Sequence, residues 1–374
     1  MKKVNHKPKR YLPKTILSHH KLALGVLAMS TATMSTLSVA AAPVTFDSKD
    51  WQVACDNTRT CRLAGYQSES DSMPISVLLS RRAGSEAKVS GRVKLGGAKE
   101  GSAKALLKLG NRHRVSLFID GKDYGETQSY SSTTNDADLT EAQVNALITA
   151  LAKTSKIEFV LRNTRWELSG KGATAVMSKA DEAQGRVGTS SALFSKGSKP
   201  NSQVLPANTL PQLRLVQPKQ SAAPKNNRTF KMASSDLTAI TQKTLANAKS
   251  DCPGLADAVS NSSGWRVSRL NSRQLLAQHQ CWVDAYNVGH GMWVINDSRP
   301  YSAKLVTVDA TSYDSGKISS IQKVRSSGDC LVKTDWVWTG KSFNKSYEST
   351  TGLCRMVEVG GAWDLPTYVS DVKS

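Results

Sequence analysis

Six cysteines that follow a basic and then apolar N-terminal stretch constrain this chain more than any other feature of its sequence. They are Cys55, Cys61, Cys252, Cys281, Cys330 and Cys354. An even number of cysteines in an exported protein predicts a disulfide framework. No Cys-x-x-Cys spacing and no cluster of cysteine and histidine occurs in the sequence, which favours structural disulfides over a metal site or a redox pair. We therefore expect neither a metal nor a cofactor.

The first 40 residues have the order of a secretory signal peptide. Residues 1–21 carry seven Lys or Arg and no acid, residues 22–39 are moderately apolar, and small residues surround Ala40. This order predicts a signal that is cleaved after Ala40. An uncleaved anchor is the alternative, but Ser30, Thr31, Thr33, Ser35 and Thr36 interrupt the apolar run, and a stable span needs about 20 apolar residues. We expect a mature protein without a transmembrane span in the periplasm of a bacterium, or secreted.

The net charge of +20 is concentrated in two segments. The first 40 residues contribute +7, residues 41–185 contribute +3, residues 186–250 contribute +9 and residues 251–374 contribute +1. A nucleic-acid site needs a basic face on a folded domain, often with aromatic residues. The most basic of the mature segments contains no Trp, Tyr or Cys, so we expect no nucleic-acid partner. A solvated linker is the favoured interpretation, and weak attachment to anionic envelope polymers or lipid head groups is the alternative.

Residues 186–235 divide the mature chain into two predicted domains. This segment has five prolines, eight basic residues and no acid, a composition typical of a linker. We predict a signal peptide over residues 1–40, an N-terminal α+β domain over 41–185, and a C-terminal β-rich domain over 236–374. Residues 210–216 could dock as an extended strand, while the linker as a whole is expected to be the first site of limited proteolysis.

Hydrophobic periodicity predicts an α+β fold in which β-structure dominates. Strand patterns cover residues 46–55, 61–67, 75–81, 90–95, 114–119, 156–161, 280–286, 291–295, 303–308, 331–339 and 343–351. The clearest helix follows Thr140, which forms a capping-box pattern with Gln143. Leu139 and Val144 can staple the start of this helix, and a second helix is expected from Leu237 to Ala248. We predict two disulfide-braced units of mainly antiparallel sheet, each with a covering helix and joined by a basic linker.

Hairpin symmetry favours one of the fifteen pairings that six cysteines allow, although the sequence alone leaves the others open. The first two cysteines lie equally far from Thr58 in a turn-prone loop. The last two lie equally far from Ser342, which would place them directly across two paired strands, at a Cα separation of about 4.5–5.5 Å. The favoured pairs are Cys55–Cys61, Cys252–Cys281 and Cys330–Cys354.

No residue pattern identifies a catalytic site. The mature chain has three histidines and lacks the motifs of serine hydrolases, zinc proteases and phosphate-binding loops. A Ser/His/Asp set could still assemble around His290 and Asp284. The acids considered for paired-carboxylate cleavage of glycosides are Asp120, Asp123, Asp329 and Glu348. These acids are more simply interpreted as solvated turn residues, and we assign no catalytic residue.

Aromatic residues concentrate in the last hundred residues and suggest a binding surface. Trp336 and Trp338 share strand parity with Cys330, so they are expected to pack over its disulfide. Two glycines precede Trp363 and permit a close approach of the backbone. Trp363 is therefore either a buried clasp for the C-terminus or part of a ligand site. The candidate ligand-binding residues are Tyr286, Asn287, His290, Trp293, Arg355 and Trp363.

Several stretches resemble the bacterial domain of unknown function 1176 family. They are residues 51–66, 91–93, 281–287, 351–355 and 360–367. The resemblance covers both halves of the chain and includes all six cysteines. It implies the fold and location of an exported six-cysteine protein and brings no activity. The first hairpin also resembles the opening of invasion-associated locus B proteins, which are small, secreted and β-rich.

The sequence thus favours an exported binding protein without catalytic activity. The expected partner is an anionic envelope polymer, peptidoglycan or a periplasmic protein. The alternatives are a hydrolase of envelope glycan or peptide and an inhibitor of a secreted hydrolase, since disulfides would make the loops of an inhibitor rigid. A cleft with convergent His and carboxylate groups would favour the hydrolase, an aromatic shelf would favour the binding protein, and a protruding loop would favour the inhibitor.

Overall fold

Five β-sheets and three α-helices make up the part of the chain that the computed structural model describes. That part comprises residues 42–96, 113–131, 134, 136–218, 234–248, 251–255 and 264–374, all within one unit that spans residues 39–374. The predicted signal peptide lies outside the described residues. Among the residues described, no helix is both long and apolar enough to cross a membrane. The predicted β-dominant α+β fold is confirmed.

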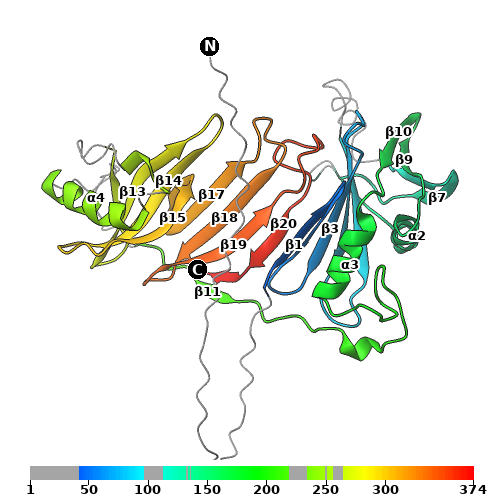
Figure 1. The fold of residues 1–374 in the computed structure, drawn as a ribbon, viewed down its shortest axis with the longest axis horizontal. Coiled ribbons are helices and arrows are strands. Elements are labelled where there is room, and N and C mark those ends of the chain that lie inside the picture. The colour runs from blue at the N-terminus through cyan, green and yellow to red at the C-terminus, as the bar shows by residue number, and fades with distance from the viewer. Residues whose placement is uncertain are drawn as a thin grey trace, which may run out of the picture. The chain divides into compact units, whose positions relative to one another are not determined.

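The N-terminal half forms two antiparallel sheets (Figure 1). The six-stranded sheet contains, in spatial order, β1 (Val44–Ser48), β2 (Trp51–Cys55), β3 (Cys61–Tyr66), β4 (Ile75–Arg81), β5 (Val89–Leu95) and β8 (Ala137–Asp138). The N-terminal four-stranded sheet contains β10 (Thr164–Leu168), β9 (Ile157–Leu161), β6 (Ser116–Ile119) and β7 (Lys122–Glu126). The single strand expected over residues 46–55 is instead the β1–β2 hairpin. Lys49 lies in the turn of this hairpin with a φ of 54°, a left-handed conformation that suits a chain reversal.

Helix α2 (Glu141–Leu151) begins with the predicted capping box. Thr140 Oγ1 accepts a hydrogen bond from the backbone N–H of Gln143 at 3.2 Å, and Gln143 Oε1 accepts one from the N–H of Thr140 at 3.0 Å. Leu139 and Val144 both lie against Gly91, where an added Cβ would come within 3.0 Å of each side chain. Glycine in β5 therefore allows the start of α2 to pack directly on the sheet.

Helix α3 (Ala173–Ala183) packs on the six-stranded sheet over β1, β2 and β3 (Figure 1) and was not predicted from the sequence. Its buried residues Ala173, Val176, Met177 and Ala180 follow a helical spacing. Gly172 is the N-cap and provides no side-chain hydrogen bond. The missing capping residue and the small size of its alanines weakened the sequence signal.

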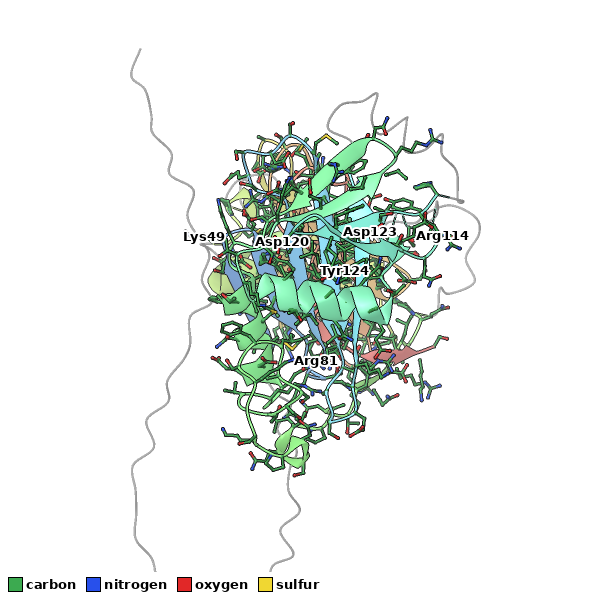
Figure 2. All side chains as sticks on the ribbon, turned by 90° about the vertical axis from the view of Figure 1, so that its right-hand side faces the viewer. Lys49, Arg81, Arg114, Asp120, Asp123 and Tyr124 are labelled. Atoms are coloured by element: carbon green, nitrogen blue, oxygen red, sulfur yellow. A yellow bond between two sulfur atoms is a disulfide. The ribbon has the colours of Figure 1, made fainter. Side chains whose placement is uncertain are left out.

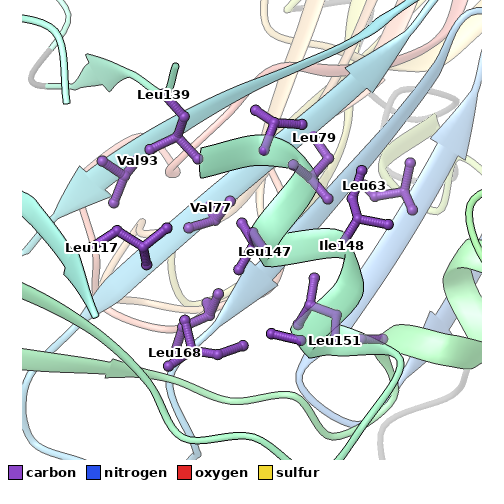
Figure 3. Close-up of a cluster of buried hydrophobic side chains, with 14 of the residues drawn as sticks. Leu63, Val77, Leu79, Val93, Leu117, Leu139, Leu147, Ile148, Leu151 and Leu168 are labelled. Carbon is purple, nitrogen blue, oxygen red and sulfur yellow. The ribbon is translucent and has the colours of Figure 1, made fainter. Parts of the chain in front are cut away.

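The main core lies between the helices and one face of the six-stranded sheet (Figure 3). Leu63, Val77, Leu79 and Val93 occupy alternate positions on β3, β4 and β5, so their side chains share that face. Leu147, Ile148 and Leu151 of α2 complete the cluster with residues of the N-terminal four-stranded sheet. Because these apolar side chains point into the core, the residues between them in each strand point to the opposite face of the sheet.

The opposite face of the six-stranded sheet is also buried in part. Ala54, Ala64, Tyr66 and Leu78 form a second cluster with apolar residues of the C-terminal segment 353–365. The two alanines let this segment approach the sheet closely. The hydroxyl of Tyr66 accepts a hydrogen bond at 3.1 Å from the backbone N–H of a residue in that segment. Burial raises the pKa of this phenol far above its usual range.

The C-terminal half contributes two antiparallel sheets and a covering helix. The C-terminal four-stranded sheet contains β12 (Arg266–Arg269), β13 (Gln274–Val283), β14 (Val288–Asn296) and β15 (Lys304–Ala310). The five-stranded sheet contains β16 (Ser312–Asp314), β17 (Lys317–Lys323), β18 (Leu331–Trp338), β19 (Phe343–Thr350) and β20 (Leu365–Val369). Helix α4 (Ser234–Ala248) includes the predicted second helix and packs against β15 of the C-terminal four-stranded sheet (Figure 1). Its Ile240 packs with Trp265 and Trp293.

The three disulfides have the favoured pairing. Cys55 and Cys61 are directly opposite each other in β2 and β3, as expected. The expectation that Cys330 and Cys354 lie opposite each other within two strands is wrong, because both lie just outside β18 and β19. Trp338 pairs with Phe343, so the hairpin is centred between Gly340 and Lys341 rather than on Ser342, and the one-residue bulge beside Trp336 is too small to restore the expected register. The expected packing of Trp336 and Trp338 over the disulfide is also wrong, since their cluster contains no cysteine.

Much of the segment predicted as a linker is bound to the rest of the unit. Thr189 is fully buried and Leu193 belongs to the main core. Strand β11 (Gln212–Arg214), which follows the 3₁₀ turn Asn201–Gln203, pairs in parallel with β21 (Asp371–Lys373) (Figure 1). The extended strand expected within residues 210–216 is therefore present. The boundaries of the two predicted domains stay a prediction.

The loop of the first hairpin connects distant parts of the chain. The side-chain amide of Asn57 donates to the carbonyl of Val369 at 3.0 Å, and its oxygen accepts from the N–H of Val369 at 2.8 Å. Arg59 Nη1 donates to the carbonyl of Pro206 at 2.7 Å. The disulfide between Cys55 and Cys61 thus holds a loop to which both β20 and the segment after α3 are attached.

Candidate functional site

A basic groove lies on the outer face of the six-stranded sheet, beside the C-terminal segment. Its volume is about 490 Å³. We define the basic groove by the charged and aromatic residues that line it, which are Arg62, Arg81, Arg82, Lys88, Arg92, Trp363 and Asp364. Four of these cations, Arg62, Arg82, Lys88 and Arg92, lie on the outer face with one carboxylate, whereas the side chain of Arg81 is buried behind the groove. The groove is therefore chemically suited to an anion.

Strand alternation explains why these side chains share the groove. The inward positions of β3, β4 and β5 are occupied by the apolar core residues, and the intervening residues point outward. Arg62 is opposite Ser80, and Ser80 is opposite Ser90, so the three side chains form one row across the sheet. Leu78 and Arg92 are opposite each other in a neighbouring row. The hydroxyl groups of Ser80 and Ser90 therefore lie on the outer face of the sheet together with Arg62 and Arg92.

The cations of the groove differ in how they are neutralised. Arg62 forms an ion pair with Asp56 at 2.8 Å, and Arg92 pairs with Asp136. Lys88 forms an exposed ion pair with a glutamate of α2 at 3.1 Å, which solvent screens strongly. Arg82 is exposed and forms no ion pair with a residue in the described ranges. Arg82 and Lys88 are therefore the charges most available to a ligand.

Trp363 forms one wall of the groove and is 6% exposed. Its indole Nε1 donates to Ser76 Oγ at 2.7 Å. The guanidinium of Arg92 lies 5.4 Å from the ring centroid and the ammonium of Lys94 lies 5.3 Å from it. Such cation–π contacts are worth about 0.5–2 kcal/mol. Trp363 is thus a buried clasp whose ring also positions a groove arginine.

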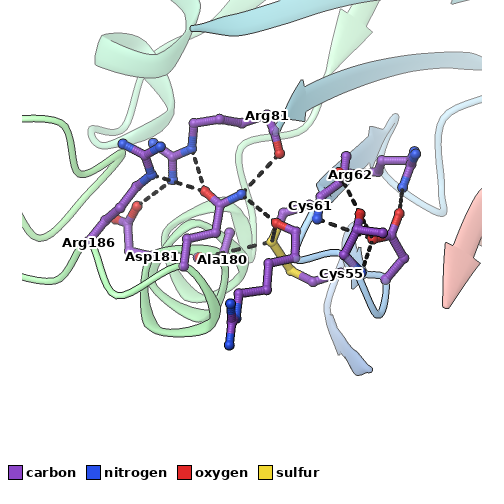
Figure 4. Close-up of a disulfide and its surroundings, with 12 residues drawn as sticks. Cys55, Cys61, Arg62, Arg81, Ala180, Asp181 and Arg186 are labelled. Carbon is purple, nitrogen blue, oxygen red and sulfur yellow. Dashed lines mark hydrogen bonds and ion pairs between the residues drawn. A yellow bond between two sulfur atoms is a disulfide. The ribbon is translucent and has the colours of Figure 1, made fainter. Parts of the chain in front are cut away.

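A buried polar network fixes the end of β4 behind the groove (Figure 4). Arg81 donates to Asp181 at 2.8 Å and to the side chain of Gln184 at 2.7 Å. The Gln184 amide donates to the carbonyls of Arg59, Arg81 and Arg82, which holds the backbone that carries Arg82. Burial lowers the pKa of Arg81, and burial together with the charge of Arg81 lowers the pKa of Arg186 to about 10.

The other predicted ligand residues do not meet in one place. Asn287 donates to the carbonyl of Lys323 at 2.8 Å, and Tyr286 donates to the carbonyl of Val324 at 3.2 Å, so both hold the β13–β14 turn against β17. His290 contacts the carbonyl of Ala310 at 3.2 Å. Trp293 is fully buried in the core beneath α4.

Arg355, also predicted as a ligand residue, joins the two halves of the chain. Its Nη2 lies 2.9 Å from Asp50 Oδ1, and its side chain is 12% exposed. The carbonyl of Arg355 accepts a hydrogen bond from Gln67 at 2.9 Å. Of the six predicted residues, Trp363 is therefore the one that lines the basic groove, and the binding role of all six stays a prediction.

The acids considered for catalysis have structural partners. Asp284 accepts hydrogen bonds from the backbone N–H groups of Tyr286 and Asn287 and so stabilises their turn. These hydrogen bonds stabilise the ionised carboxylate and lower the pKa of Asp284. Asp120 accepts a hydrogen bond from the backbone N–H of Lys156 at 2.8 Å, and Asp123 accepts one from the N–H of Gly125 at 2.7 Å. Both acids are labelled in Figure 2. Within the described ranges, no group of three or more His, Cys, Asp or Glu residues is placed to hold a metal ion.

Asp329 is buried beside the last disulfide. Its carboxylate accepts hydrogen bonds from Arg325 at 2.7 Å, from Ser327 at 2.6 Å and from the N–H of Met356 at 2.7 Å. Burial alone would raise the pKa of Asp329, but these bonds and the charge of Arg325 outweigh burial and lower the pKa to about 2. The carboxylate therefore ties the turn before Cys330 to the segment after Cys354.

We expect Asp329 to make the stability depend on pH in the acid range. Its pKa is about 2 in the native state and about 3.9 when unfolded, so the ionised carboxylate stabilises the native state above pH ~4 and loses this effect as the pH falls towards 2. The contribution is about 2 kcal/mol. Urea unfolding at pH 7 and pH 3 should show that Asp329→Asn removes part of the loss. An equal loss in both proteins would contradict this role.

The four cations of the groove were not among the binding residues predicted from the sequence; they are Arg62, Arg82, Lys88 and Arg92. Their segment, residues 41–185, carries a net charge of only +3, whereas residues 186–250 carry +9, so the net charge gave no sign of a basic site there. Strand alternation could have indicated the groove, because the polar residues between the core residues of adjacent strands must all lie on the same outer face of the sheet. Trp363 could not be assigned to that face, because nearly 300 residues separate it from β3.

Comparisons with known proteins relate the whole chain, rather than any one site, to a family. The sequence pattern of the family described as "Protein of unknown function (DUF1176)" matches residues 45–370. The chain is also 23% identical over 355 residues to a protein of Escherichia coli (strain K12) named "Uncharacterized protein YpfG", a match that covers 89% of this chain and 95% of that protein. No solved structure matches the chain.

Proposed function

We infer the function of this chain, which belongs to the DUF1176 family of proteins of unknown function, from its basic groove. We propose that it is an exported, periplasmic protein that binds an anionic polymer of the cell envelope without catalysis. The leader-like first 40 residues and the three disulfides support an oxidising compartment outside the cytoplasm. The match brings the family assignment alone, so the chemistry of the groove carries the proposal.

The observation that carries it is the available charge of Arg82 and Lys88 beside a row of serines. Arginine recognises carboxylates and phosphates with two parallel hydrogen bonds, and serine hydroxyls can both donate and accept. The residues that line the groove include no histidine and no cysteine, so they supply charge and hydrogen bonds rather than a nucleophile with its base. This composition favours binding over hydrolysis.

Three of the five stretches that carry the resemblance to the family contribute residues to this groove. Arg62 follows the second cysteine of the first hairpin, Arg92 follows Gly91, and Trp363 precedes Asp364 near the C-terminus. Each stretch also has a structural task, since Gly91 admits α2 and Trp363 covers the sheet. The groove is the place where their polar side chains converge.

We expect the mature protein, residues 41–374, to co-sediment with purified peptidoglycan sacculi, which carry free carboxylates. The double variant Arg82→Ala/Lys88→Ala should bind about tenfold more weakly, a change of about 1.4 kcal/mol. Binding should also weaken as the salt concentration rises, and on sacculi whose carboxylates have been amidated.

The matched control is Lys171→Ala/Lys196→Ala. It removes the same charge from two exposed lysines outside the groove and should bind like the unchanged protein. Equal weakening of both double variants would show that net charge, rather than the groove, drives the association, and unchanged binding of the groove variant would reject the proposal.

A further inference from the structure

A second, separate cavity opens between the C-terminal four-stranded sheet and the five-stranded sheet. Its volume is about 300 Å³, which is at the lower end of the range of small-molecule sites, roughly 300–1,000 Å³. We call it the intersheet cleft and define it by Val294, Lys304, Trp336, Lys341, Phe343 and Lys345. None of these residues lines the basic groove.

One wall of the cleft is apolar and aromatic. Val294 belongs to the cluster that joins the two sheets, and Trp336 and Phe343 pack at the edge of that cluster. Phe343 is fixed by Trp338, whose ring centroid lies 5.2 Å away, and by Tyr313 at 6.2 Å. Trp336 is half-buried and lines the cleft. A fixed, partly exposed indole of this kind can stack on a planar ring.

The strand register places cations on the same face as this wall. Lys304 is opposite Val294, and Lys345 is opposite Trp336, and opposite residues of an antiparallel pair point to the same side. Lys341 lies in the β18–β19 turn at the edge of the cleft. The ammonium groups therefore border the apolar wall rather than the outer surface of the sheets.

Two of these lysines are not neutralised. Lys345 pairs with Glu348 at 3.0 Å, whereas Lys304 and Lys341 form no ion pair with any residue in the described part of the chain. The cleft is lined by three lysines and by no carboxylate. A cation beside an apolar surface attracts an anion more strongly than a fully hydrated cation does, because the local dielectric constant is lower.

We propose that the intersheet cleft binds a small organic acid that carries a planar ring. The ring packs against Trp336 and Phe343, and the acid group lies between Lys304 and Lys341. The volume suits one such molecule rather than a polymer. This site is independent of the envelope-binding function proposed for the basic groove.

The test uses two fluorescent probes that differ in charge. 8-Anilinonaphthalene-1-sulfonate has planar rings and a sulfonate, and N-phenyl-1-naphthylamine has the same rings without the acid group. We expect the mature protein to bind the sulfonate at one site. Lys304→Ala/Lys341→Ala should raise the dissociation constant of the sulfonate at least about tenfold and leave that of the neutral probe unchanged, while Trp336→Ala should weaken both.

The groove variant Arg82→Ala/Lys88→Ala is the matched control and should bind the sulfonate like the unchanged protein. Its use distinguishes a failure of the proposal for the cleft from a failure of the proposal for the basic groove. Thermal unfolding of each variant checks that probe binding does not report a loosened core. Equal affinity for both probes, or a sulfonate affinity that survives the double lysine change, would overturn the proposal. Displacement by phenyl phosphate would support an aryl acid as the ligand, whereas displacement by galacturonate alone, whose ring is not planar, or displacement by neither acid would overturn the proposal.

Discussion

Replacing Trp363 with alanine is expected to destabilise the protein by about 3–5 kcal/mol, the usual cost of truncating a large aromatic side chain in a core. Trp363 is 6% exposed and packs on Ala54, Ala64 and Leu78. The change would empty the space between the C-terminal segment and the sheet, and would leave Ser76 without its indole partner. Denaturant unfolding should show the loss, and the melting temperature should fall by several degrees.

Two controls separate burial from other effects of the Trp363 change. Trp363→Phe keeps most of the apolar volume and should cost clearly less than the alanine variant. Phe46→Ala removes an aromatic residue that is 37% exposed on an edge strand and should cost far less. A Trp363→Ala protein of unchanged stability that no longer binds sacculi would show that the ring acts as a ligand platform instead of a clasp.

Removing the carboxylate of Asp181 is expected to cost a similar amount, about 3–5 kcal/mol, because it leaves buried charge unpaired. The side chains of Arg81 and Asp181 are 2% and 0% exposed. Asp181 also accepts hydrogen bonds from the N–H groups of Leu193 at 2.9 Å and Phe194 at 3.0 Å. Asp181→Ala should therefore loosen the segment after α3, which urea unfolding and limited proteolysis would both detect.

The neighbouring residue provides the matched control for Asp181. Glu182 lies on the same helix, its side chain is 55% exposed, and it pairs with Lys179 one turn away. Glu182→Ala should change stability by no more than about 0.5 kcal/mol. Equal effects of the two substitutions would mean that the buried network around Arg81 contributes little to stability.

Elements that depend on residues close together in the chain were predictable. The capping box of Thr140 and Gln143 fixed the start of α2, and the symmetric loop around Thr58 gave the Cys55–Cys61 pair. Elements with weak local signals were not. Helix α3 begins at a glycine without a side-chain cap, and the β18–β19 hairpin turns between Gly340 and Lys341 rather than at Ser342, which puts Cys330 and Cys354 out of the expected register. In both cases tertiary packing outweighed local preference.

The sequence by itself determined the β-dominant fold and the outward-facing polar positions of each strand, because these follow from alternation along the chain. It favoured the disulfide pairing without excluding the other pairings. The tertiary structure alone decided which outward positions meet. It placed Trp363 beside Arg62 and Arg92, and it bound the segment after α3 to Asp181. Contacts between residues far apart in sequence depend on how whole sheets pack, and no local pattern encodes that packing.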